Sequence, residues 1–137
     1  MVEVAKNWLE ILTDGSAAVK AIYGDLVPKL NNLEFHELIV HQDGPRVSLR
    51  FDLAEFPSQP PKKWLIAGAN KVQISLMLVS VCDLKICGIK TDAKIDLNIE
   101  RRGGCINAWG GCDGFDFSLQ AEFLMLNSIS AYRDDIM

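Results

Sequence analysis

The four cysteines are the most reactive side chains of this chain. Their spacings, C-x4-C and C-x6-C, differ from the C-x2-C pairs that are typical of zinc sites. Cys82 and Cys87 are five residues apart on an extended segment, so they should face opposite sides of it. Cys105 and Cys112 flank a glycine-rich turn, and a tight hairpin there would pair neither with the other. We therefore expect four free thiols in a reducing compartment.

Two histidines and one glycine-rich segment complete the search for a reactive site. His36 and His41 have an odd separation on a predicted strand, so they should face opposite ways and share a metal only if a bulge intervenes. A cysteine–histidine nucleophile pair would depend on contacts in space, and no local signature supports one. The stretch from Gly110 to Gly114 lacks the Lys-Ser/Thr of a phosphate loop and predicts a hairpin turn. We predict no metal and no cofactor.

Carboxylates gather on the predicted outward positions of the strands, at Asp52, Asp96, Glu100, Asp116 and Glu122. A close pair of carboxylates serves acid–base chemistry on glycosidic bonds, whereas a row of them on a wet sheet face is the ordinary solvated case. Trp64 and Trp109 lie next to predicted loops, where an aromatic residue can be core, lid or interface anchor.

The hydrophobic pattern predicts two N-terminal helices followed by strands. Apolar residues from Val4 to Leu12 form one helical stripe, and Ser16 can cap a second helix over residues 17–23. From residue 33 the pattern alternates with a period of two, interrupted by an Asp43-Gly44 turn and a proline-rich loop over residues 56–64. The expected strands cover residues 33–42, 46–53, 71–79, 83–88, 93–100, 105–109 and 115–123.

Short turns between these strands favour antiparallel neighbours, because parallel neighbours need long crossovers. We expect one α+β domain over residues 1–137, with the N-terminal helices packed on one face of a six- or seven-stranded, mostly antiparallel meander sheet. Val47, Leu49 and Phe51 should be buried, with Ser48 and Arg50 more exposed.

Composition and net charge indicate which classes of partner to expect. Of the 137 residues, 49% are apolar and 23% are charged, which is typical of a globular protein, and the net charge is −4. A nucleic-acid binder normally carries a basic stripe, so we expect no nucleic-acid partner. The longest apolar run, around residues 76–82, is too short to span a bilayer, and the N-terminus lacks a signal-peptide pattern. We expect a cytoplasmic protein without a membrane partner.

Several segments together are similar to one family. They are Trp8-Leu9-Glu10, Ala21-Ile22-Tyr23-Gly24, Leu33-Glu34-Phe35-His36-Glu37, the run from Asp43 to Leu53, Phe56-Pro57, Pro60-Pro61-Lys62-Lys63-Trp64, Asn70-Lys71-Val72-Gln73 and Ser130-Ala131-Tyr132-Arg133. The chain resembles the immunity protein 50 family, whose members are found beside toxins in bacterial polymorphic toxin systems. The block from Asp43 to Trp64 is the most specific part of the resemblance.

The resemblance implies a protein that binds and neutralises a cognate toxin and needs no nucleophile, metal or cofactor. Such a protein requires a stable scaffold, a polar face complementary to the toxin and a few buried anchors. We predict that the acidic outer face contacts the toxin, and we add one aromatic anchor; these candidates are Asp96, Glu100, Asp116, Glu122 and Trp64. Two alternatives stay open: a small enzyme that uses the carboxylates, and a structural or ligand-binding subunit. The oligomeric state stays open as well.

Overall fold

Eight antiparallel strands and three short helices make up residues 7–135, the part of the chain that this computed structural model describes. The strands are β1 (Leu33–His41), β2 (Arg46–Asp52), β3 (Lys71–Val79), β4 (Asp83–Gly88), β5 (Ala93–Arg102), β6 (Cys105–Cys112), β7 (Phe115–Ala121) and β8 (Phe123–Tyr132). They lie in the order β4-β7-β6-β5-β1-β2-β3-β8. The α+β class and the antiparallel sheet are confirmed. The predicted number of strands and the simple meander are wrong, because β4 pairs with β7 and β8 pairs with β3.

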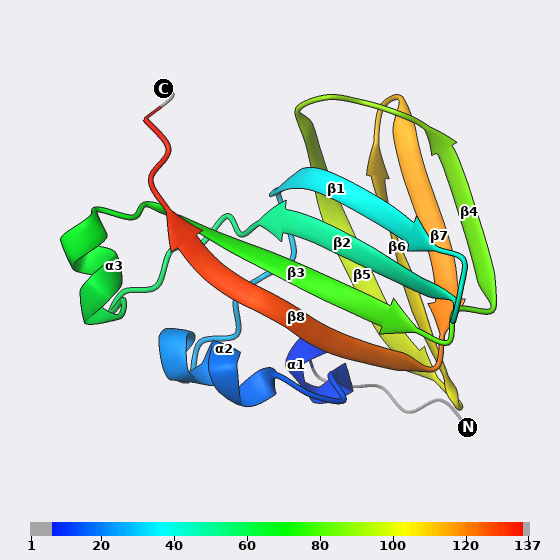
Figure 1. Cartoon of the computed structure of the whole chain (residues 1–137), viewed down its shortest axis with the longest axis horizontal. Helices are drawn as coiled ribbons and strands as arrows, with labels where there is room; N and C mark the ends of the chain where they lie inside the picture. Colours follow the sequence, from blue (N-terminus) through cyan, green and yellow to red (C-terminus); the bar gives the residue numbers. More distant parts are fainter. Residues whose placement is uncertain (1–6, 136–137) are drawn as a thin grey trace.

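The sheet divides into two halves where β1 leaves β5. These two strands pair only over residues 33–35 of β1, after which they diverge (Figure 1). We call β1, β2, β3 and β8 the first half-sheet, and β4, β5, β6 and β7 the second half-sheet. The chain passes from the first to the second between β3 and β4, and returns between β7 and β8.

Alternating side chains fill one core that both half-sheets share. Val47, Leu49 and Phe51 are buried, whereas Ser48 and Arg50 are partly exposed, so the predicted register of β2 is confirmed. Aromatic side chains join the halves: Phe35 of β1 lies 5.6 Å, ring centre to ring centre, from both Phe115 and Phe117 of β7. Offset aromatic packing at this separation is favourable.

The N-terminal helices pack at two separate places on this core. Helix α1 (Trp8–Ile11) lies against β5, and α2 (Ser16–Tyr23) lies against β8. Trp8 Nε1 donates to the Pro28 carbonyl at 2.9 Å, and the Tyr23 hydroxyl donates to the Glu55 carbonyl at 2.6 Å. Ser16 is the first helical residue rather than the predicted cap, a position taken by Gly15. The Val4 end of the predicted stripe lies outside the described residues.

Two elements were not predicted. Helix α3 (Lys62–Ala67) begins directly after Pro61, inside the segment expected to be a loop, and the Pro61 carbonyl accepts hydrogen bonds from the backbone N–H groups of Trp64 and Leu65. Strand β8 was missed because Asn127 and Ser128 break the alternation, and the register with β3 shifts at this point. The predicted strand over residues 115–123 therefore ends at Ala121, and Phe123 begins β8 with an exposed side chain rather than an inward one.

Strand β6 continues through Gly110 and Gly111, where the sequence predicted a turn. A Cβ atom on Gly111 would lie 2.6 Å from the Asp116 Cβ and 2.7 Å from the Phe115 carbonyl oxygen. Without that side chain β7 can approach β6 closely, and the β6–β7 ladder continues to Cys112 while the β5–β6 ladder continues to Gly111. The turn is confined to Asp113 and Gly114.

We expect Gly111→Ala to lower the free energy of unfolding by about 1–3 kcal/mol, the usual cost of forcing an atom into a packed position. Gly104→Ala is the matched control, because a Cβ atom added there would meet no atom within 4 Å beyond its own chain neighbours. It should change stability by less than about 0.5 kcal/mol. Urea unfolding of the two variants measures the difference, and equal stabilities would show that the β6–β7 contact has room for a methyl group.

Candidate functional site

The outer face of the second half-sheet brings together three of the predicted contact residues. Asp96 of β5 and Asp116 of β7 are both paired with Gly111 of β6, so the two carboxylates flank a position that has no side chain. Glu100 lies four residues further along β5, on the same face. Asp96 accepts a hydrogen bond from the Asn32 backbone N–H at 2.8 Å, and Glu100 forms an ion pair with Arg102 at 3.2 Å.

Trp109 stands in the middle of this face. Its cross-strand neighbours are Asn98 and Ser118, in the row next to the Asp96–Gly111–Asp116 row. The indole is 39% exposed, although the same strand buries Ile106 and Ala108. An exposed tryptophan surrounded by polar side chains is typical of an interface anchor. We call Asp96, Asn98, Glu100, Trp109, Asp116 and Ser118 the Trp109 face.

The other two predicted residues lie elsewhere. Glu122 is exposed at the corner between β7 and β8, where its backbone N–H donates to the Val79 carbonyl at 3.2 Å. Trp64 belongs to α3 and packs against Phe56, with ring centres 6.4 Å apart. Helix α3 lies at the opposite end of the molecule from β4 and β7 (Figure 1). Trp64 and the acidic residues therefore do not form one contact surface.

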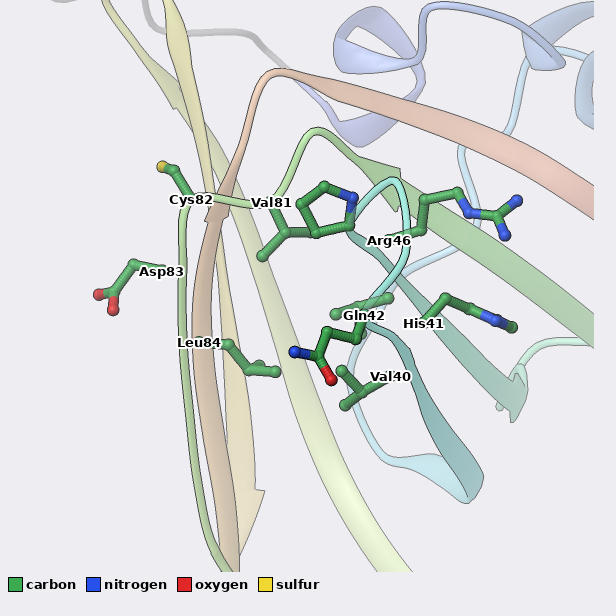
Figure 2. Close-up of a pocket in the computed structure, with 10 residues that line it drawn as sticks. Val40, His41, Gln42, Arg46, Val81, Cys82, Asp83 and Leu84 are labelled. Atoms are coloured by element: carbon green, nitrogen blue, oxygen red, sulfur yellow. The ribbon is translucent and has the colours of Figure 1, made fainter.

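An apolar groove runs between the β1–β2 hairpin and β4. Figure 2 shows the side chains of Leu84 and Val40 directed toward each other across it. Val40 is 49% exposed because β1 has left β5 at this point. The groove holds about 220 Å³, and its lining also includes His41, Cys82 and Asp83.

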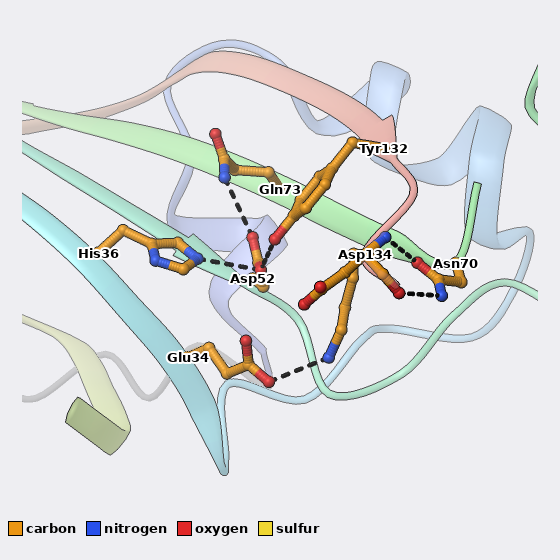
Figure 3. Close-up of polar contacts among 8 residues, drawn as sticks. Glu34, His36, Asp52, Asn70, Gln73, Tyr132 and Asp134 are labelled. Carbon is orange, nitrogen blue, oxygen red and sulfur yellow. Dashed lines mark hydrogen bonds and ion pairs between the residues drawn. The ribbon is translucent and has the colours of Figure 1, made fainter. Parts of the chain in front are cut away.

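A polar cluster occupies the other end of the first half-sheet, on its outer face (Figure 3). At its centre Asp52 is only 1% exposed. Its Oδ1 accepts from Gln73 Nε2 at 3.1 Å, and its Oδ2 accepts from the Tyr132 hydroxyl and lies 2.9 Å from His36 Nε2. These donors offset the cost of removing a carboxylate from water. Asp52 lies on the predicted face, but the expectation that it is solvated is wrong.

A β-bulge places His36 in this cluster. The register of β1 against β2 shifts between Phe35 and Glu37, which makes His36 the extra residue. After the bulge the alternation is reversed, so His41 also reaches the outer face, where its Nε2 lies 3.4 Å from Ser48 Oγ. The prediction that the two histidines face opposite sides is therefore wrong. The partners of His36 are acidic instead: donor atoms of Glu34, His36 and Asp52 all lie within 4.8 Å of one another.

Charges around the cluster are balanced by Lys71. Its Nζ contacts Glu34 Oε1 at 3.0 Å, and this hydrogen bond, with the charges of Glu34, Asp52 and Asp134, raises the pKa of Lys71. Burial raises the pKa of Tyr132 above its ordinary value, and the hydrogen bond to Asp52 adds to the shift. At neutral pH Lys71 is therefore charged, and Tyr132 keeps the proton that it donates. An open cavity of about 510 Å³ lies beside Glu34, His36 and Tyr132.

Four of the segments that are similar to the immunity protein 50 family meet in this cluster. Segments far apart in the chain contribute Glu34 and His36, Asp52, Gln73 and Tyr132. The family model described as immunity protein 50 matches residues 15–132. The chain belongs to the immunity protein 50 family. The match begins just before α2 and ends at the last residue of β8, so the family's region spans all eight strands. No curated protein and no solved structure matches the chain.

The sequence also led to expectations about the cysteines and about membrane spans in this immunity protein 50 family member. All four cysteines, each within the described residues, are free, and Cys82 donates weakly to the Gln120 carbonyl at 3.7 Å. Across residues 7–135 we find no helix with the length and hydropathy that a membrane span requires.

Proposed function

We propose that this immunity protein neutralises its toxin by direct binding through the Trp109 face. Membership of the family indicates an immunity function in general. The observation that carries the specific proposal is the position of Trp109, exposed on an antiparallel face in the row next to Asp96 and Asp116. Burying an indole under a partner gains a large contact area at a low cost in side-chain entropy.

The charges of the Trp109 face favour a toxin with a basic contact surface. On the outer positions of the second half-sheet, the four carboxylates of Asp83, Asp96, Glu100 and Asp116 outnumber by one the three cations Lys85, Lys94 and Arg102. Complementary charge speeds the encounter of two proteins and disfavours wrong partners. Tight binding over the toxin's active site blocks it by occlusion, which requires no reaction on the immunity protein.

The enzyme alternative has less support. Asp96 and Asp116 are close enough in register to suggest a catalytic pair, but both stand exposed on an open sheet face. Such a face has no means of excluding water from a reaction, and enzymes generally close their sites against it. For direct binding the same exposure is favourable, because a partner protein can reach both carboxylates.

Charge reversal at Asp116 tests the proposal. Asp116 is exposed and faces Gly111 across the ladder, so Asp116→Lys should change the free energy of unfolding by less than about 0.5 kcal/mol. If its charge pairs with the toxin, the variant should lose roughly 2–5 kcal/mol of binding free energy, at least a thirtyfold weaker Kd. Isothermal titration against the cognate toxin measures the affinity, and urea unfolding measures the stability.

Asp25→Lys provides the control, because Asp25 is equally exposed but follows α2, outside the Trp109 face. It makes the same change of net charge, so any general electrostatic effect appears in both variants. Equal affinities of the two variants would contradict the proposal and would show that the acidic face is only solvated.

A further inference from the structure

We propose that Glu34, His36 and Asp52 bind a divalent transition-metal ion, of which zinc fits best. This inference goes beyond the immunity function and differs from the prediction of no metal site. The three side chains offer one imidazole nitrogen and two carboxylate oxygens, with the donor atoms within 4.8 Å of one another. Imidazole and carboxylate together are a donor set that zinc uses in sites with three protein ligands.

The backbone supplies the geometry. Glu34 and Asp52 are directly paired across β1 and β2, and the bulge adds His36 on the same face. Zinc–nitrogen and zinc–oxygen bonds are about 2.0–2.2 Å, so two ligand atoms of one tetrahedral ion lie about 3.3–3.6 Å apart. His36 Nε2 and Asp52 Oδ2, at 2.9 Å, are close enough to share an ion. The donor atom of Glu34 lies within 4.8 Å of the other two, and its side chain can turn toward them by a change of rotamer.

Surrounding groups hold the ligands in place. Gln73 and Tyr132 donate to Asp52, and hydrogen bonds of this kind orient metal-binding carboxylates. Asp52 is buried, whereas the His36 side chain is 31% exposed. Glu34 and His36 line the open cavity, which provides the path for an ion. Three protein ligands leave one position of a tetrahedral ion for water or for a partner's side chain.

The ammonium group of Lys71 competes with a metal ion for Glu34. Its ammonium group contacts Glu34 at 3.0 Å, and the nearby charges of Glu34, Asp52 and Asp134 all favour a positive charge at this position. A zinc ion takes over that role when Lys71 moves aside toward the cavity. A metal site and a purely structural ion-pair network predict different effects of removing Lys71. At a metal site the removal should improve metal binding, whereas in a structural network it would only weaken the network.

The test is a zinc titration of the full chain. Isothermal titration should give one zinc ion per chain for the unaltered protein, and His36→Gln should weaken its Kd at least about tenfold. Lys71→Met should bind zinc at least about threefold more tightly because the competing charge is gone. Since free thiols also bind zinc, histidine side-chain NMR locates the ion: the ring resonances of His36 should shift on zinc addition, and those of His41 should not.

His41→Gln is the matched control, because His41 lies on the same face outside the cluster. It should keep the zinc affinity of the unaltered protein. Unchanged His36 resonances at saturating zinc would overturn the proposal, and so would equal affinities of His36→Gln and His41→Gln. Weaker binding by Lys71→Met would also overturn it, because the ion would then not lie beside Glu34.

Discussion

Trp109→Ser should weaken toxin binding by about 2–4 kcal/mol, the range of a tryptophan hot spot at a protein interface. The indole is 39% exposed at the centre of the Trp109 face, and its removal takes away the largest side chain that a partner can bury there. Its cross-strand neighbours, Asn98 and Ser118, are small polar residues that would leave a hollow under the toxin. Isothermal titration against the toxin gives the change in Kd, expected to be at least thirtyfold.

Trp64→Ser is the control for this measurement. Trp64 packs on Phe56 at α3, far from the second half-sheet, so its loss should reduce stability but leave toxin affinity nearly unchanged. The reverse result, with affinity lost in Trp64→Ser and kept in Trp109→Ser, would place the toxin on α3. In that case the two lysines before Trp64 would favour an acidic contact surface on the toxin.

Asp52→Ala should lower the free energy of unfolding by about 3 kcal/mol. The substitution removes the acceptor of the hydrogen bonds from Gln73 and Tyr132 together with the ion-pair partner of His36, and each partly buried group left without its partner costs about 1 kcal/mol or more. Urea unfolding measures the loss. Asp52→Asn keeps one carbonyl acceptor and should fall between the alanine variant and the unaltered protein.

Glu37→Ala tests whether this cost belongs to the cluster or to any carboxylate on the same face. Glu37 pairs with Arg50 at 3.4 Å, and both side chains are more than one-third exposed (37% for Arg50 and 44% for Glu37). Exposed ion pairs contribute from nothing to about 1 kcal/mol. A loss in Asp52→Ala no larger than that of Glu37→Ala would mean that water replaces the carboxylate without penalty.

Local patterns predicted the faces of the strands well and their partners poorly. The alternation at Val47, Leu49 and Phe51 fixes which side is buried, because a one-residue shift would expose the whole set. Strand order depends on contacts between distant segments, so the pairings of β4 with β7 and of β8 with β3 left no local trace. Gly110 and Gly111 were misassigned because glycine suits both a turn and a close approach of strands.

The candidate site was predictable to the same extent. Asp96 and Asp116 share a face because both alternate with buried residues, which the sequence displays directly. The polar cluster was not predicted, since the bulge at His36 reverses the alternation and Tyr132 approaches Asp52 from 80 residues away. The resemblance held a signal for it, because four of its separate segments contribute Glu34 and His36, Asp52, Gln73 and Tyr132 to the cluster.

The division of the sheet implies an order of assembly. The second half-sheet is one continuous stretch, residues 83–121, whereas the first needs Phe123 to reach Val79 across that stretch. While residues 83–121 are unfolded, the pairing of β8 with β3 must close a loop of about 40 residues, which costs conformational entropy. Once it has folded, Cys82 and Gln120 are hydrogen-bonded and hold the two ends together. We therefore expect the second half-sheet to fold as the inner unit and β8 to add to β3 afterwards, with the hydrogen bond from Tyr132 to Asp52 forming in the closing step.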